Sequence, residues 1–284
     1  MSQATAVEAP RADCRIDAAG RLTFELDLPE ATAPQLLLRL RPKKGQEETT
    51  GHAVELVDVP GAPGRWRAEL GTNPRLSEGR WDAYVLTAAD RPRLRVLPGL
   101  RDLRSLAPAA PVEPLLEGGV LRVRLPYATK DGFLSVRAWQ RAGHAEVTRM
   151  EPGQHALTVH GRLLGAEFGS GAAAVLRRRG KEGPERETEL TTGTEGDAGA
   201  FTFTADYREL PTEPGASAVW NVFVRPATGA RPVRVGRLLD DVADRKAVFV
   251  YPTSTVRGFT CWPYHTLDND LSIEVSPATE VAGD

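Results

Sequence analysis

An acidic triplet near the C-terminus, Asp268-Asn269-Asp270, has the residue types and spacing of a metal site. Two carboxylates separated by one residue hold a divalent cation in many transferases, because oxygen ligands suit Mg²⁺ and Mn²⁺. Such a site follows a parallel strand of an α/β domain, whereas this triplet joins two segments that read as antiparallel strands. Asp and Asn side chains stabilise such turns by bonding to nearby backbone. We therefore expect a structural turn, with no metal and no cofactor.

Aromatic residues and one histidine precede this triplet. Aromatic side chains in such a cluster stack on a sugar ring, fill a protein interface or complete a hydrophobic core. We predict a binding site and no catalytic residue in this segment. The predicted site consists of Tyr251, Phe259, Trp262, Tyr264, His265, Asp268, Asn269 and Asp270.

Other catalytic motifs are missing from the sequence. The five histidines show neither His-x-x-x-His nor His-Glu-x-x-His spacing, so we expect no zinc site. There is no nucleophile elbow, phosphate-binding loop or dinucleotide fingerprint either. Catalysis by residues dispersed over several strands stays open at this point.

The acidic triplet belongs to a segment that occurs twice in the chain. Residues 126–137 and 263–274 share Pro, Tyr, Thr, Asp, Leu and Ser at the same positions. Upstream, Trp81 matches Trp220, and further matches keep the same order in both halves. This internal repeat predicts two copies of one domain. We place the copies at residues 11–143 and 144–277, between a disordered N-terminal tail at 1–10 and a C-terminal tail at 278–284.

Each copy reads as a series of short strands. Leu22, Phe24 and Leu26 alternate with polar residues, which places the apolar side chains on one face of a half-buried strand. Similar runs recur between Gly-, Pro- and Asn-rich turns. This pattern predicts an all-β protein of two tandem antiparallel β-sandwiches, immunoglobulin-like in type. Trp81 and Trp220 are predicted core residues, and residues 240–245 a short helical turn.

Net charge, apolar runs and cysteine content indicate which partners the chain binds and in which compartment it is found. The chain has 284 residues, a formal net charge of −2 and a pI near 6.3, which gives no overall attraction to nucleic acid. It has no signal-peptide pattern and no apolar run of about 20 residues that would insert into a membrane. We expect a cytoplasmic protein in which Cys14 and Cys261 are reduced.

The paired Pro-Tyr-x-Thr-x-Asp-x-x-Leu-Ser ends resemble the accessory immunoglobulin-like modules of bacterial cell-wall polymer glycosyltransferases, including wall teichoic acid transferases. In that family the modules follow a catalytic domain that binds nucleotide sugar and metal, and that domain has no counterpart in this sequence. The resemblance covers both repeats. It implies oligomerisation and contact with the polymer, and it carries no catalytic residue over.

Two functions follow from these observations. The first is a non-catalytic tandem module that assembles with a protein partner or with itself, or that binds glycan, as an accessory to a cell-wall polymer transferase. The alternative is a stand-alone enzyme of specialised metabolism or glycan modification, with its site at the cleft between the domains. The lack of a recognisable catalytic motif favours the first.

Overall fold

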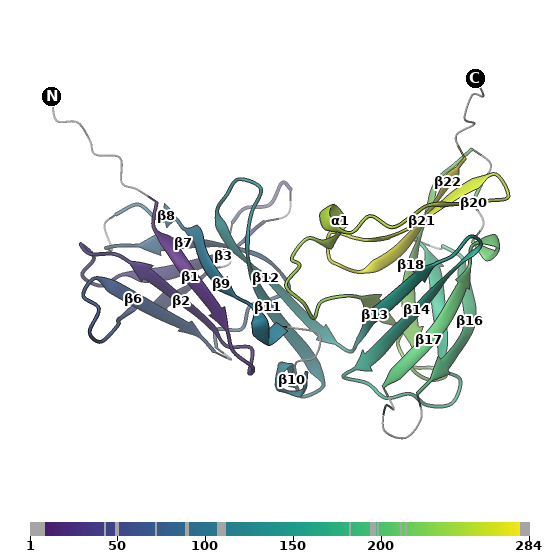
Figure 1. Ribbon diagram of the computed structural model, residues 1–284, viewed down its shortest axis with the longest axis horizontal. Coiled ribbons are helices and arrows are strands. Elements are labelled where there is room, and N and C mark those ends of the chain that lie inside the picture. Colours follow the sequence, from purple (N-terminus) through teal and green to yellow (C-terminus); the bar gives the residue numbers. More distant parts are fainter. Residues whose placement is uncertain are drawn as a thin grey trace. The chain divides into compact units, whose positions relative to one another are not determined.

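The chain is nearly all β, and a computed structural model shows its strands forming two compact units (Figure 1). The first unit takes in the chain up to Glu117, together with Arg122–Gln140 and Leu239–Ala243. The second takes in Gly118–Leu121, Arg141–Leu238 and the chain from Asp244. The two expected tails lie almost wholly outside the described residues. The structure describes residues 9–42, 44–48, 51–71, 73–88, 91–106, 112–181, 183–193, 197, 199–210, 212–213 and 215–278.

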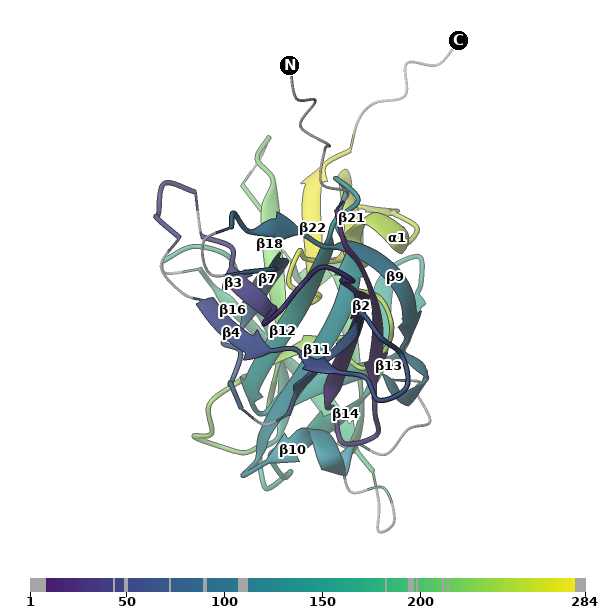
Figure 2. The same ribbon diagram turned by 90° about the vertical axis from the view of Figure 1, so that its left-hand side faces the viewer.

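The first unit contains two hydrogen-bonded sheets. One has the strand order β5-β6-β2-β1-β9, so that β1 lies between β2 and β9 (Figure 2), and the other has the order β10-β11-β12-β7-β3-β4 with β8 paired to β7. Two short 3₁₀ turns, Arg104–Leu106 and Glu113–Leu115, lie between β9 and β10. The strands are β1 (Arg11–Ile16), β2 (Leu22–Asp27), β3 (Gln35–Leu40), β4 (Gly51–Glu55), β5 (Val57–Asp58), β6 (Arg65–Leu70), β7 (Gly79–Leu86), β8 (Leu94–Arg95), β9 (Leu97–Asp102), β10 (Leu116–Glu117), β11 (Val120–Ala128) and β12 (Leu134–Ala142).

Alternation along the strands builds the core of the first unit. Leu22, Phe24 and Leu26 of β2 are fully buried, and the polar residues between them face outward. Trp81 of β7 is also fully buried, as predicted, and its indole N–H donates to Ser77 O at 2.9 Å. The outward face of β1, β2 and β6 is consequently polar.

The strands of the second unit form one sheet with the order β15-β16-β17-β14-β13-β19-β18-β22-β21-β20, and β15 also pairs with β18. This added pairing closes the strands from β13 to β19 into a barrel, because β16 and β19 each bridge strands that a sandwich would keep in separate sheets. The strands are β13 (His144–Pro152), β14 (Ala156–Leu164), β15 (Ala173–Arg178), β16 (Glu185–Thr192), β17 (Ala200–Asp206), β18 (Ala218–Arg225), β19 (Val233–Gly236), β20 (Ser254–Val256), β21 (Phe259–His265) and β22 (Leu271–Pro277).

The core of the second unit surrounds Trp220, which is fully buried as predicted. Two short helical elements accompany the strands, a 3₁₀ turn at Tyr207–Glu209 and helix α1 at Arg245–Val248. The helical turn predicted over 240–245 is therefore displaced, since only its last residue is helical. Cys14 and Cys261 are both buried and free, and burial raises the pKa of the Cys14 thiol to about 12.

Candidate functional site

Four of the predicted residues lie on β21 and three in the turn that joins β21 to β22, whereas Tyr251 precedes β20. In this turn the side chain of Thr266 organises the backbone. Thr266 N donates to Asp270 O at 2.8 Å, and Thr266 Oγ1 accepts from the backbone N–H groups of Asp268 and Asp270 at 3.2 and 3.3 Å. Asn269 adopts a positive φ of 60°, a conformation that Asn tolerates better than most residues. The expected structural turn is present. The side chain that accepts the backbone N–H groups of the turn is the Thr266 hydroxyl, whereas we had expected the Asp and Asn side chains to do so.

Asn269 and Asp270 are buried by contacts with the rest of the second unit. Asn269 Oδ1 accepts from the backbone N–H of Arg245 at 3.1 Å, which attaches the turn to the first residue of α1. The Asp270 carboxylate lies 3.4 Å from Arg141 Nη1 and 3.3 Å from Arg234 Nε. Both side chains therefore stabilise the fold around the turn, and neither is directed to solvent.

His265 occupies a fully buried position at the end of β21. Both ring nitrogens lack a hydrogen bond to any described residue, and the nearest aromatic neighbour is Tyr251, with ring centroids 5.8 Å apart. Burial, together with the positive charges of Arg245 and Arg237, lowers the pKa of His265 from 6.5 to about 3, and burial is the largest of these causes. The ring is thus neutral at physiological pH, close to the positive charges of Arg245 and Arg237.

The remaining aromatic residues form a stacked pair. The rings of Trp262 and Tyr264 are 5.1 Å apart with an interplanar angle of 24°, and Lys246 Nζ lies 5.1 Å from the centroid of the Tyr264 ring. Tyr264 is buried, whereas Tyr251, Phe259 and Trp262 are half-buried and Asp268 is exposed. Seven of the eight predicted residues therefore lie on one strand and the turn after it, and four of the eight are buried.

Four exposed apolar residues in and near this turn were not predicted from the sequence. Val248, Phe249, Val250 and Leu267 are 63%, 38%, 78% and 54% exposed. These four are most of the six large hydrophobic residues that are exposed in the described part of the chain. We call them the apolar strip. The unbroken sequence Ala247-Val-Phe-Val-Tyr251, which fits neither the helical nor the strand period, was the available signal.

No group of three His, Cys, Asp or Glu side chains in the described ranges could hold a metal ion. Across the same residues, no helix has the length and hydrophobicity of a transmembrane segment.

Comparisons with known proteins give distant matches only. No protein family and no curated protein matches the sequence. Among solved structures, TarS from S. aureus has a TM-score of 0.32 at 16% identity, with 74% of this chain and 38% of that one covered. A fragment of the same protein, residues 217–571, has a TM-score of 0.30 at 16% identity, with 72% and 58% covered. The chain thus spans less than two thirds of either structure, and TM-scores near these values do not establish a common fold.

Proposed function

We propose that this chain is a non-catalytic tandem β-module that assembles with a second copy of itself through the apolar strip of the second unit. The observation that carries the proposal is that Val248, Phe249 and Val250 are consecutive exposed residues, and that the turn with the exposed Leu267 is hydrogen-bonded to the start of α1. Scattered single hydrophobic residues are normal on a protein surface, whereas a contiguous group marks a contact site. One residue predicted from sequence is connected to this strip, because Asn269 Oδ1 accepts the backbone N–H of Arg245, the first residue of α1.

Charges at the rim of the strip support a second copy as the partner. Lys246 and Asp268 are both exposed, and they flank the strip on its helix side and on its turn side. A two-fold axis that passes between these two residues would place each cation opposite the anion of the other copy, which is the arrangement of a self-complementary surface. A stable contact of this kind buries about 800 Å² on each partner.

The proposal includes the tandem repeat, at residues 11–143 and 144–277. Matching strand pairings support it. β7 pairs with β12 through Gly79–Asp82 and with β8 through Tyr84 and Val85. β18 likewise pairs with β22 through Ala218–Asn221 and with β19 through Phe223 and Val224.

The closing turns agree as well. Thr129 Oγ1 accepts from the N–H of Phe133 at 3.1 Å, and Gly132 has a φ of 80° at the position that matches Asn269. We further propose two immunoglobulin-like domains in a cytoplasmic protein that acts beside a cell-wall polymer transferase. The two free cysteines suit a reducing compartment.

Hydrogen exchange of the purified chain at low and high protein concentration tests the proposal. We expect the backbone amides of residues 248–251 and 267–268 to gain protection at high concentration, because association covers them. Amides around Leu100, which is 79% exposed on the first unit, serve as the internal control and should not change. Equal exchange at both concentrations would remove the strip as the contact surface, and turnover of a substrate by the purified chain would establish the enzyme alternative.

A further inference from the structure

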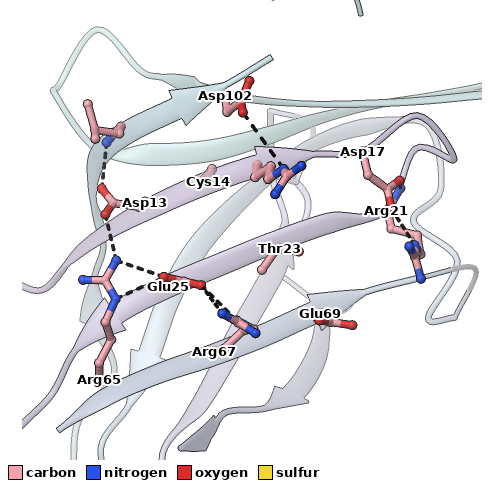
Figure 3. Close-up of a pocket in the computed structure, with 12 residues that line it drawn as sticks. Asp13, Cys14, Asp17, Arg21, Thr23, Glu25, Arg65, Arg67, Glu69 and Asp102 are labelled. Carbon is pink, nitrogen blue, oxygen red and sulfur yellow. Dashed lines mark hydrogen bonds and ion pairs between the residues drawn. The ribbon is translucent and has the colours of Figure 1, made fainter. Parts of the chain in front are cut away.

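The outward face of β1, β2 and β6 in the first unit has a hollow of about 560 Å³ (Figure 3). Four arginines and five carboxylates line it, together with Thr23, Cys14 and Leu100. Most of these charges are already paired within the protein. The hollow is therefore polar and nearly neutral overall, which distinguishes it from a binding site for a strongly charged ligand.

Ion pairs hold the base of the hollow in one arrangement. Arg65 donates from Nε to Glu25 Oε2 at 3.1 Å and from Nη2 to Asp13 Oδ2 at 3.0 Å. Asp13 Oδ1 accepts the backbone N–H of Leu100 at 2.8 Å, and a Cβ on Gly99 would lie 2.3 Å from that same oxygen. Glycine at this position thus allows the carboxylate to approach the strand, and the base is fixed before any ligand arrives.

Groups that can bind a ligand remain open beside this base. Arg67 directs Nε and Nη2 to Glu25 Oε1 at 2.9 and 2.7 Å, which leaves its Nη1 group for another acceptor. Thr23 and Glu69 are opposite each other across β2 and β6, and neither side chain has a hydrogen bond to a described residue. Figure 3 shows Thr23 in the middle of the hollow, next to Arg67 and Glu69 on the neighbouring strand.

These open groups combine one strong donor, one strong acceptor and one hydroxyl. Neighbouring hydroxyl groups on a sugar ring can accept from Arg67 and donate to Glu69 at the same time, in charge-assisted hydrogen bonds. An ionic ligand would instead have to displace an internal ion pair. Leu100, 79% exposed at the rim, supplies apolar surface for the C–H face of a ring.

The second unit does not repeat this chemistry. By the repeat proposed above, Glu25 and Arg67 correspond to His160 and Thr202, which are likewise direct cross-strand partners. His160 Nδ1 and Thr202 Oγ1 are hydrogen-bonded to each other at 3.0 Å. At these two positions the proposed copies share the strand pairing, and a hydrogen bond from His160 to Thr202 replaces the Glu25–Arg67 ion pair. His160 Nε2 also lies 3.1 Å from Glu151 Oε1 in the second unit, so the two faces differ in which side chains are paired and in how they are arranged.

We propose that the hollow on β1, β2 and β6 binds a neutral saccharide, with Arg67, Thr23 and Glu69 as its hydrogen-bonding groups. This site is separate from the apolar strip and does not depend on self-association. It extends the function from assembly to recognition of a glycan.

Titration of the purified full chain with chitotriose, cellotriose and maltotriose, followed by NMR, tests this site. We expect at least one of these sugars to bind, and Glu69→Gln and Thr23→Val each to weaken that binding about tenfold through loss of one hydrogen bond. Glu189→Gln, at an exposed strand glutamate of the second unit, is the matched control and should bind as the wild type does. Urea unfolding of each variant checks that the fold is retained.

Two results would overturn the site. One is the absence of binding to all three sugars up to about 20 mM, a concentration that reveals even a Kd of several mM. The other is binding of tripolyphosphate in place of the sugars, which would make the hollow an anion site. Val248→Ser with Val250→Ser should leave sugar binding unchanged and Glu69→Gln should leave self-association unchanged, so failure of one proposal is distinguishable from failure of the other.

Discussion

In the proposed repeat strand β7 of the first unit corresponds to strand β18 of the second, and the two strands carry different charges. In β7, Asp82 Oδ1 accepts from Arg41 Nη2 at 2.6 Å and from Ser135 Oγ at 2.7 Å. In β18, the matching residue is Asn221, whose Oδ1 accepts from Ser272 Oγ at 3.1 Å and from Arg179 Nη2 at 3.2 Å. The hydrogen-bond geometry is shared, and the ionic contribution belongs to the first unit alone.

A second position shows a similar exchange of partners. Arg95 lies 4.5 Å from the ring centroid of Phe133 in the first unit, a cation–π contact. In the second unit Arg234 forms an ion pair with Asp270, which follows the turn at the position of Phe133. Asp270, which has the residue type and spacing of a metal ligand in the sequence, therefore forms an ion pair with a half-buried arginine of its own unit.

The largest expected effect tests whether each unit has a hydrophobic core built around its own tryptophan. Replacing Trp81 or Trp220 by alanine should each lower the free energy of unfolding by about 3 to 5 kcal/mol, because both side chains are fully buried. Denaturant unfolding measures this loss, with Val57→Ala at a 54% exposed position as the control. A loss below about 1 kcal/mol for either tryptophan would contradict its place in the core.

The second prediction concerns His265, which has no histidine counterpart in the first unit. Its folded pKa of about 3 lies below the ordinary value of 6.5, so the unfolded chain binds the proton first as the pH falls. The contribution of the neutral His265 ring to the free energy of unfolding is therefore complete above pH 6.5. It declines by about 1.4 kcal/mol per pH unit as the pH falls toward 3.

His265→Gln should flatten this slope between about pH 6.5 and 5, a window above the ordinary titration range of the carboxylates. The measurement is urea unfolding at several pH values, with His155→Gln at an exposed histidine of the same unit as the control. An unchanged slope in His265→Gln would show that the ring is not held neutral.

Periodicity predicted the β class and the burial of both tryptophans, because alternation directly records which face of a strand is buried. It could not show that β16 and β19 close the second unit into a barrel, since that depends on pairing between distant strands. The acidic triplet was correctly assigned to a turn. The sequence could not reveal that Asn269 and Asp270 face inward, because their partners Arg245, Arg141 and Arg234 come from other elements.

The third prediction concerns Asp82, which is replaced by the asparagine that the second unit has at the proposed equivalent position, Asn221. Asp82→Asn should cost about 1 to 2 kcal/mol of unfolding free energy at neutral pH, since it removes the charge-assisted bonds from Arg41 and Ser135. Burial raises the pKa of Asp82, but these hydrogen bonds outweigh it and the pKa is lowered below 3.8.

The contribution of Asp82 is therefore present above pH 3.8 and lost as the pH falls through its folded pKa. Denaturant unfolding of wild type and Asp82→Asn should differ at neutral pH and converge in acid. A constant difference at every pH would assign the loss to packing.

The smallest expected effect distinguishes the two tryptophans. Trp81 donates its indole N–H to Ser77 O, whereas the indole N–H of Trp220 has no hydrogen bond to a described residue. Trp81→Phe should therefore cost about 1 kcal/mol more than Trp220→Phe. Denaturant unfolding of the two variants measures the difference, and equal costs would show that this hydrogen bond adds nothing.

Sedimentation equilibrium across the micromolar range tests assembly through the apolar strip most directly. We predict that the wild-type chain associates with increasing concentration, and that Val248→Ser with Val250→Ser weakens association at least tenfold through loss of apolar contact, about 1.4 kcal/mol. Leu100→Ser, at an equally exposed apolar residue of the first unit, should associate as the wild type does. A wild-type chain that stays monomeric, or a double variant that associates as strongly as the wild type, would contradict the account.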